Sequence, residues 1–431
     1  MMLDRTTPPS VRPLGEFQID LPELHLMRNG IPLHVIQAGS QDVVRLDLLI
    51  GGGQWHQTQP LQAMFTNRML REGTSSMSSS KIAEKLDYYG AWLELSSSVN
   101  YGFITLYSLN KYFPYTLAII SDMLMNPVFP EKELEVVTET NRQQFLVNST
   151  RVEVIARKQL NRSLFGDQHP FGRYAVESDY GRITSDVLRE FYHDYYHSGN
   201  CSVYISGKVT PGIIQCIEDH IGNASWGKTR EMPSLRLVEP QKTTQKHVFV
   251  EKADALQNSL KMGGFMMDRT HPDFLKARVM VNLFGGYFGS RLMSNIREDK
   301  GYTYGIGAGI VNCPGNGVLV ITTEADSVYI DSIITEVYRE MDKMCNDLAP
   351  KDELEMVRSY MLGDLCRSYE GPFSLSDAWI YVETAGLNDD FFTHSLDAIR
   401  NVTADDIRTL AQRYLCKENL IEVVAGKKNV I

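Results

Sequence analysis

The chain has 431 residues and a formal net charge of -10, with 43% hydrophobic and 22% charged residues. This length and composition predict a water-soluble globular protein of about two domains, and no apolar run is long enough to span a bilayer. The negative charge argues against nucleic-acid binding, and the six cysteines lack the spacing of metal ligands.

In the first half of the chain the sequence predicts two strands and a capped helix, with no targeting segment before them. Residues 1–17 show neither a secretory nor a mitochondrial targeting pattern, so a cytoplasmic location is expected. Residues 43–50 and 103–109 have the apolar alternation of strands. Thr184 predicts the start of a helix that runs to about Tyr195, because a threonine side chain caps free backbone N–H groups, and Thr403 in the second half likewise predicts a helix to about Tyr414.

Segments of the first half recur in the second half at an almost constant offset. Residues 130–137 resemble residues 350–357 at an offset of 220, and residues 183–189 resemble 402–408 at an offset of 219. The segment around Gly207 and Lys208 recurs at Gly426 and Lys427, again at an offset of 219. Three matches in the same order indicate an internal duplication.

The duplication predicts two homologous domains. We expect an N-terminal domain at residues 1–228, a linker at 229–246 and a C-terminal domain at 247–431, because the linker region combines prolines with a Gln/Thr/Lys stretch. Residues 304–310 and 317–323 are predicted strands. Strands and helices are interspersed without a phosphate-binding glycine motif, so we expect an α+β fold in which each half is a mostly antiparallel sheet covered by helices.

Residues 62–74, QAMFTNRMLREGT, carry the most informative motif. They resemble the helix of pitrilysin/insulinase-type metallopeptidases, which has H-x-x-E-H followed by Gly-Thr. In that motif two histidines bind Zn²⁺ and the glutamate takes a proton from the metal-bound water. Here Met64, Asn67 and Arg68 stand at the three motif positions. Methionine is a poor zinc ligand, asparagine cannot act as a base and arginine keeps its positive charge, so we expect no metal in this chain.

The resemblance also implies a third zinc ligand, a glutamate roughly 75 residues beyond the second histidine position. Counting 76 residues from Arg68 reaches Gln144, an amide, and Glu139 lies about one turn away. Gln144 is equally well interpreted as an ordinary polar helix residue. Even a carboxylate there cannot hold zinc without the two histidines.

Two further segments support the resemblance and identify a second group of site residues. Residues 165–173 contain H-P-F-G-R, and residues 289–304 contain the family's S-R-L, R-E, G and Y pattern. The resemblance implies that Arg297 and Tyr304, seven residues apart, stabilise the oxyanion at the zinc site of a partner subunit in trans. The alternative is a surface arginine beside a core tyrosine. Gly285, Gly286 and Gly289 resemble a mobile substrate-contacting loop, or else form a packing turn.

Histidines are weak candidates for a metal site elsewhere in the chain. His193 and His197 are four residues apart near a helix end, but the matching helix end of the second copy, Arg413-Tyr414, has no histidines. His56 lies near the motif, where a single histidine beside Arg68 does not make a site.

The resemblance implies the zinc-less subunit of a heteromeric metallopeptidase similar to the processing peptidase, inactive alone. Its partner would be a zinc-binding relative in a heterodimer, the substrate a peptide, and zinc the partner's cofactor; a homodimer is possible for this chain alone. A non-catalytic peptide-binding or scaffold protein is the first alternative, and a self-sufficient zinc peptidase the second. No nucleic acid and no membrane are expected as partners.

Overall fold

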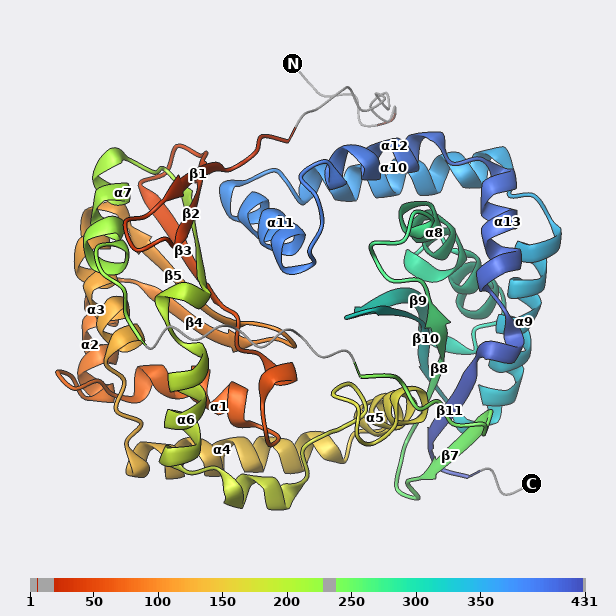
Figure 1. The fold of residues 1–431 in the computed structure, drawn as a ribbon. Helices are drawn as coiled ribbons and strands as arrows, with labels where there is room; N and C mark the ends of the chain where they lie inside the picture. Colours follow the sequence, from red (N-terminus) through yellow and green to blue (C-terminus); the bar gives the residue numbers. More distant parts are fainter. Residues whose placement is uncertain (1–5, 7–18, 228–237, 429–431) are drawn as a thin grey trace.

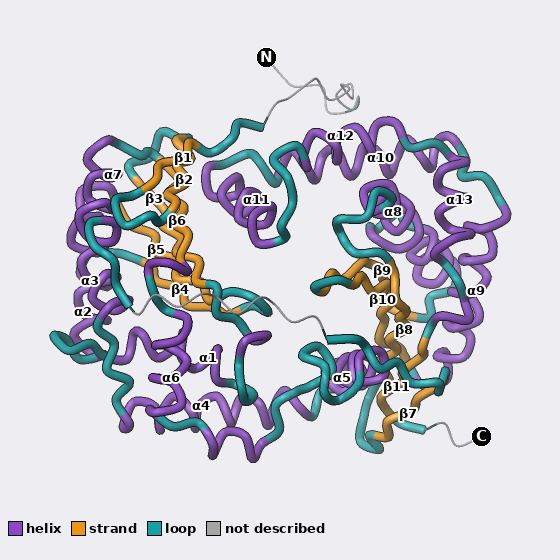
Figure 2. The backbone as a smooth tube through the Cα atoms, in the orientation of Figure 1, coloured by secondary structure: helices purple, strands orange, loops and turns teal. Residues whose placement is uncertain are grey.

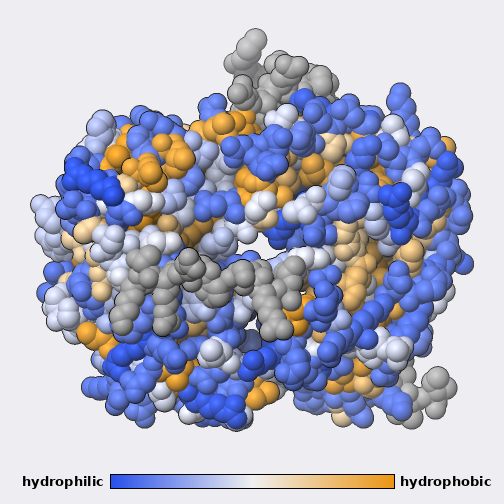
Figure 3. All heavy atoms as spheres, viewed as in Figure 1, coloured by the Kyte–Doolittle hydropathy of each residue, from blue (hydrophilic) through white to orange (hydrophobic). Residues whose placement is uncertain are grey.

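The computed structural model describes residue 6 and residues 19–227 and 238–428 (Figure 1). Two sheet-and-helix halves lie on either side of a central opening in the ribbon, and the space-filling view is hollowed at the same place (Figures 1 and 3). Among the described residues no helix is long and apolar enough to cross a membrane. The α+β class and the two homologous halves expected from the sequence are confirmed.

The first half is built on a six-stranded sheet with strand order β1-β2-β6-β3-β5-β4. All neighbours are antiparallel except β2 and β6, and β3 lies at the centre of the sheet with seven of its eight residues buried. The strands are β1 (Glu23–Leu26), β2 (Pro32–Gln37), β3 (Val43–Ile50), β4 (Trp92–Ser97), β5 (Gly102–Leu109) and β6 (Cys201–Gly207). The helices are α1 (Gln62–Met69), α2 (Ser79–Tyr88), α3 (Phe113–Met125), α4 (Glu131–Ser149), α5 (Val152–Phe165), α6 (Ser185–Tyr195) and α7 (Pro211–Ile217).

The second half repeats this arrangement with five strands in the order β7-β11-β8-β10-β9, in which only β7 and β11 are parallel. The strands are β7 (His247–Glu251), β8 (Asn258–Met266), β9 (Thr303–Cys313), β10 (Asn316–Ala325) and β11 (Ile421–Gly426). The helices are α8 (Phe274–Val281), α9 (Ile330–Asn346), α10 (Lys351–Arg367), α11 (Pro372–Thr384), α12 (Phe391–Asn401) and α13 (Ala404–Tyr414). Two π-helical segments, η7 (Asn282–Gly286) and η8 (Met293–Asp299), lie between α8 and β9.

The predicted helix starts are found at corresponding places in the two halves. Thr184 accepts a hydrogen bond from the backbone N–H of Val187, and Thr403 accepts one from Asp406. The Asp406 carboxylate in turn accepts a hydrogen bond from the backbone N–H of Thr403, which completes a capping box. Each capped helix leads into a strand with one parallel neighbour, β6 beside β2 in the first half and β11 beside β7 in the second, which agrees with a duplicated unit.

Each half supplies one helix to the sheet of the other half (Figures 1 and 2). α5, from the first half of the sequence, packs on β8 and β11 of the second sheet, where Leu160 and Phe165 are buried against Val318 and Ile421. α11, from the second half, packs on β2 and β6 of the first sheet. All strands of the first sheet therefore precede residue 228 and all strands of the second sheet follow it, but α5 and α11 each pack on the sheet of the other half.

The segment expected to be a linker lies only partly within the described residues. Residues 229–237 are outside them. Residues 238–246 form a loop along α5, because the backbone N–H groups of Gln241 and Thr243 donate to the carbonyl groups of Phe165 and Ser163.

Candidate functional site

The motif residue Asn67 is locked into the core of the first half. It lies in α1 with 1% of its surface exposed, and its Nδ2 donates to the hydroxyl oxygen of Tyr196 at 3.1 Å. Tyr196 is fully buried, and this burial raises the pKa of its hydroxyl. Asn67 therefore has a structural partner at the position where a general base would stand, and its neutral amide cannot accept a proton.

Arg68 occupies the second histidine position and turns toward α4. Its Nη1 donates to Oδ1 of Asn141 at 3.1 Å, while Nδ2 of Asn141 donates to the carbonyl of Val137 at 2.7 Å. The helix therefore offers Arg68 an amide oxygen that is already held in place. Sequence counting missed Asn141, because a register over more than 70 residues is uncertain by about one helical turn.

Gln144 and Glu139, the two residues considered for the third ligand position, also lie on α4 but do not contact Arg68. Gln144 lies three residues beyond Asn141 and is exposed. Glu139 is exposed, and hydrogen bonds from Arg142 and Gln143 lower its pKa to about 2. The residue of α4 that contacts Arg68 is therefore Asn141, and neither Gln144 nor Glu139 makes this contact.

The motif region does not fit a zinc ion. Zinc requires nitrogen, sulfur or carboxylate ligands that carry no positive charge, whereas the side chains here are a thioether, an amide and a guanidinium. Within residues 19–227 and 238–428 no group of three or more His, Cys, Asp or Glu side chains is arranged to hold a metal ion.

The three histidines considered from the sequence lie in unrelated surroundings. His193 is exposed on α6, whereas His197 lies beyond the end of that helix and is completely buried. His56 is half-buried with its ring 5.3 Å from that of Tyr195, and this burial lowers its pKa. His193 and His197 therefore do not face a common ligand position.

Arg297 and Tyr304 are brought together at the end of η8 and the start of β9. The Arg297 guanidinium carbon lies 5.5 Å from the centre of the Tyr304 ring and 4.4 Å from that of Phe288, so the cation stands against two aromatic faces. Tyr304 is 90% exposed and Phe288 65% exposed. Phe288 was missed in the sequence because nothing local indicates that it contacts Arg297.

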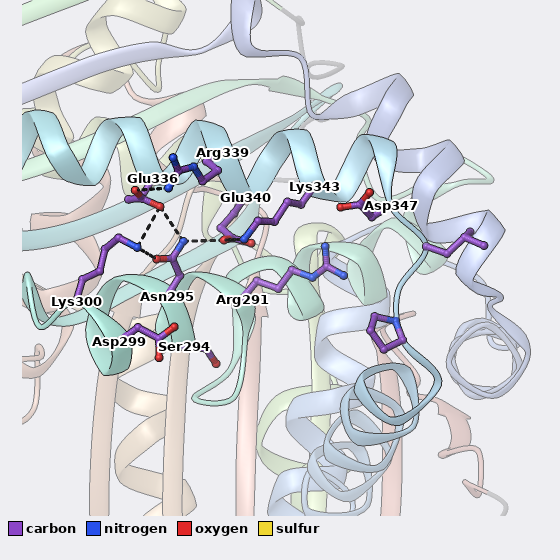
Figure 4. A pocket seen from close by; sticks show the side chains of 12 residues that line it. Arg291, Ser294, Asn295, Asp299, Lys300, Glu336, Arg339, Glu340, Lys343 and Asp347 are labelled. Carbon is purple, nitrogen blue, oxygen red and sulfur yellow. Dashed lines mark hydrogen bonds and ion pairs between the residues drawn. The ribbon is translucent and has the colours of Figure 1, made fainter.

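A buried polar network fixes η8 close to Arg297 (Figure 4). The amide of Asn295 donates to Glu336 at 3.0 Å and to Glu340 at 2.6 Å, and its oxygen accepts from Lys300 at 2.7 Å. Asn295, Glu336 and Glu340 are all buried. Because both the nitrogen and the oxygen of this amide are used, η8 is tied to α9 two residues before Arg297.

The three glycines considered as a substrate loop differ in their surroundings. A Cβ at Gly285 would lie 2.7 Å from the Cβ of Ala308 and 2.8 Å from its backbone nitrogen, so η7 approaches β9 as closely as a glycine allows. A Cβ at Gly286 would meet the side chain of Asn282 at 2.5 Å, and one at Gly289 the ring of Tyr287 at 2.8 Å. The close approach at Gly285 matches the packing-turn alternative. The exposed residues of the segment, Gly286, Phe288 and Gly289, lie next to it.

Comparisons with known proteins identify relatives of both halves. Residues 34–171 match the model of the insulinase family, peptidase family M16, and residues 182–361 match the model described as the peptidase M16 inactive domain. A Bacillus subtilis relative named "uncharacterized zinc protease YmxG" is 24% identical over 348 residues, covering 80% of this chain and 83% of the relative. The "non-peptidase homolog YmxG" of Helicobacter pylori is 24% identical over 261 residues, 59% of each chain.

The solved structures show the same fold. A Pseudomonas fluorescens protein described as a peptidase M16 inactive domain superposes with a TM-score of 0.83 at 19% identity, covering 95% of this chain and 99% of that one. A Helicobacter pylori protein described as a protease superposes with a TM-score of 0.83 at 13% identity, covering 94% of this chain and all of the other.

Proposed function

Because the chain belongs to the insulinase family of peptidases, family M16, and its own motif helix has no metal ligand, we propose that it is the zinc-free subunit of a two-subunit peptidase. Its partner is a family relative that keeps the H-x-x-E-H motif and holds the zinc. This chain forms one side of the substrate chamber and presents Arg297 and Tyr304 to the partner's site.

The observation that carries this proposal is the preorganised pair of the exposed Tyr304 and the partly buried Arg297, whose Nη1 also donates to Glu298 at 2.6 Å. A guanidinium keeps its charge at any working pH, and a phenol hydroxyl donates a hydrogen bond, so both stabilise an oxygen that becomes negative in the transition state. The contact with Phe288 holds the Arg297 side chain, and the Asn295 network fixes the helical segment that carries it, before substrate arrives. Such preorganisation matters because a group that must first move contributes less to catalysis.

The strand beside the pair supports binding of an extended peptide. β9 is the edge strand of its sheet, so one row of its backbone groups is free of the ladder. A Cβ placed at Gly305 or Gly309 would meet no atom within 4 Å, which leaves room for another backbone next to this strand. Main-chain hydrogen bonds along such an edge recognise extended peptides with little sequence preference.

The test reconstitutes the chain with an H-x-x-E-H relative encoded in the same genome and measures complex formation together with kcat. Arg297→Ala is expected to leave association intact and to lower kcat on the order of 10²-fold, the usual scale for losing one oxyanion donor. Tyr304→Phe is expected to act likewise, and the double change less than additively, because both groups serve one transition state.

The matched control is Arg189→Ala, which removes an exposed arginine that pairs with Asp186 on α6, away from the proposed site. It should change neither association nor turnover. Full turnover in Arg297→Ala and Tyr304→Phe complexes would refute the proposal and support a scaffold or peptide-binding subunit instead. The cytoplasmic location and a homodimer of this chain stay predictions.

A further inference from the structure

A cavity of about 580 Å³ lies between the two halves, on the side of the degenerate motif. Its first wall contains Trp55, Leu61 and Met64, which come from the motif region of the first half. Its opposite wall contains Val311 and Val320 from β9 and β10 of the second sheet. This volume lies within the range of about 300–1,000 Å³ typical of small-molecule sites.

The floor of the cavity is rigid and apolar. Leu160 and Phe165 of α5 contribute to its lining, and both are buried in the cluster that joins α5 to the second sheet. Cys313 and Val318 belong to the same cluster and also line the cavity. Met64 adds a thioether where a metal ligand stands in the zinc-binding motif, and a thioether adapts to irregular apolar surfaces. The walls therefore favour an apolar body.

The charged side chains of the lining are all cationic. Arg157, Arg173 and Lys261 line the cavity, and no Asp or Glu is among its lining residues. Glu153, which is not among the lining residues, lies 3.5 Å from Arg157 and 3.6 Å from Lys261 and neutralises part of this charge. The cavity thus combines apolar walls with an excess of positive charge.

Lys261 is the buried member of this group. It is 8% exposed on β8, and its ammonium donates a hydrogen bond to Thr322 on the neighbouring strand at 2.5 Å. Burial lowers its pKa, because an ammonium is less well solvated there than in water. A bound anion would restore the lost solvation and favour the charged form.

We propose that this cavity binds a small amphipathic carboxylate, with its apolar body between the motif wall and the second sheet and its carboxylate paired with Lys261. Apolar burial supplies most of the affinity, and the charged hydrogen bond selects an anion over a neutral or cationic molecule of the same shape. The site needs neither the zinc of a partner nor Arg297, so it stands or falls independently of the proposed peptidase function.

The experiment titrates the full chain with submicellar decanoate, 1-decanol and decyltrimethylammonium by calorimetry at neutral pH. Lys261→Met removes the charge and keeps an unbranched apolar side chain, so decanoate affinity is expected to fall roughly tenfold or more while decanol affinity stays unchanged. Val320→Phe fills part of the cavity and should weaken both ligands. Lys276→Met, which removes a half-exposed lysine paired with Asp406 outside the cavity, is the control.

Thermal unfolding of each variant shows that it is folded before its titration is interpreted. Saturable decanoate binding that responds to Lys261→Met and to Val320→Phe but not to Lys276→Met supports the proposal. Absence of saturable decanoate binding by the unmodified chain would overturn it, as would equal affinity for decyltrimethylammonium or an affinity that neither cavity variant changes.

Discussion

Replacing Arg45 by methionine is expected to destabilise the protein strongly, because it leaves a buried carboxylate without its ion partner. Arg45 lies on β3, where its Nε donates to Asp47 at 3.0 Å and its Nη2 donates to Asp377 of α11 at 2.5 Å. Asp47 is 1% exposed and also accepts a hydrogen bond from Thr105 at 2.7 Å. This ion cluster fastens α11 of the second half to the sheet of the first.

The magnitude follows from the burial of each partner. Removing the partner of a buried charge costs about 3–5 kcal/mol, and Asp47 is buried enough for that range to apply. Asp377→Asn is the matched control, because that side chain is 62% exposed and its pair contributes at most about 1 kcal/mol. The double variant Arg45→Met with Asp47→Asn removes the charge itself and should recover much of the loss.

The destabilisation by Arg45→Met is expected to depend on pH, and the burial of Asp47 determines whether it grows or shrinks as pH rises. Desolvation raises the pKa of Asp47 in the folded protein, while Arg45 and Thr105 oppose that rise, so removing Arg45 raises the pKa further. A carboxyl with a folded pKa above its unfolded value binds more protons when folded, and the free energy of unfolding therefore falls as pH rises through the folded pKa. The loss in Arg45→Met should be largest at about pH 8 and smaller at about pH 5.

Urea unfolding followed by circular dichroism, at several pH values, measures these free energies. Arg45→Met should lower the urea midpoint much more than Asp377→Asn does. Acidification should reduce the difference in unfolding free energy between Arg45→Met and the unmodified protein. A loss below about 1 kcal/mol at pH 8, or one that grows on acidification, would show that Asp47 does not depend on Arg45 for its charge.

Two further predictions follow from the motif helix and from η7. Elemental analysis of the purified chain is expected to find far less than one zinc per chain, and a peptidase assay is expected to find no cleavage. The same is expected of the triple variant Met64→His, Asn67→Glu and Arg68→His, because the neighbouring Asn141 and Tyr196 do not support a metal. One zinc per chain together with chelator-sensitive cleavage would contradict this prediction. Gly285→Ala is expected to lower the free energy of unfolding by about 1–3 kcal/mol, since its Cβ meets the backbone of β9. Gly286→Ala, whose Cβ has the Asn282 side chain rather than backbone as its nearest neighbour, should lower it by less than Gly285→Ala does, and equal thermal shifts would refute the distinction.

Much of the fold was predictable because its signals are local or repeated. The alternation of apolar residues predicts the strand at residues 43–50, and the helix caps at Thr184 and Thr403 depend on a few neighbouring residues. The duplication is visible because both copies keep similar segments in the same order. The exchange of α5 and α11 was not predictable, since each helix packs on a sheet whose strands lie far away in sequence.

Part of the candidate site was likewise predictable from the sequence, and part of it required the structure. The lost ligands at Met64, Asn67 and Arg68 are visible from residue types alone. The partners of these residues, Asn141 and Tyr196, come from other helices and required the structure. The same holds for Phe288 beside Arg297, a contact between the turn that follows η7 and the π-helical segment η8.

The exchange of α5 and α11 sets an order of events while the chain is being synthesised. When residue 227 leaves the ribosome, the strands of the first sheet have all been made, but the end of α11 lies 384 - 227 = 157 residues further on. At about 5–20 residues per second this gap lasts roughly 8–30 s. During that time Ile36, Leu49 and Tyr204, which α11 later covers, face water, and α5 has no sheet to pack on. Until translation supplies α11, the nascent first half therefore exposes apolar surface that the finished protein buries.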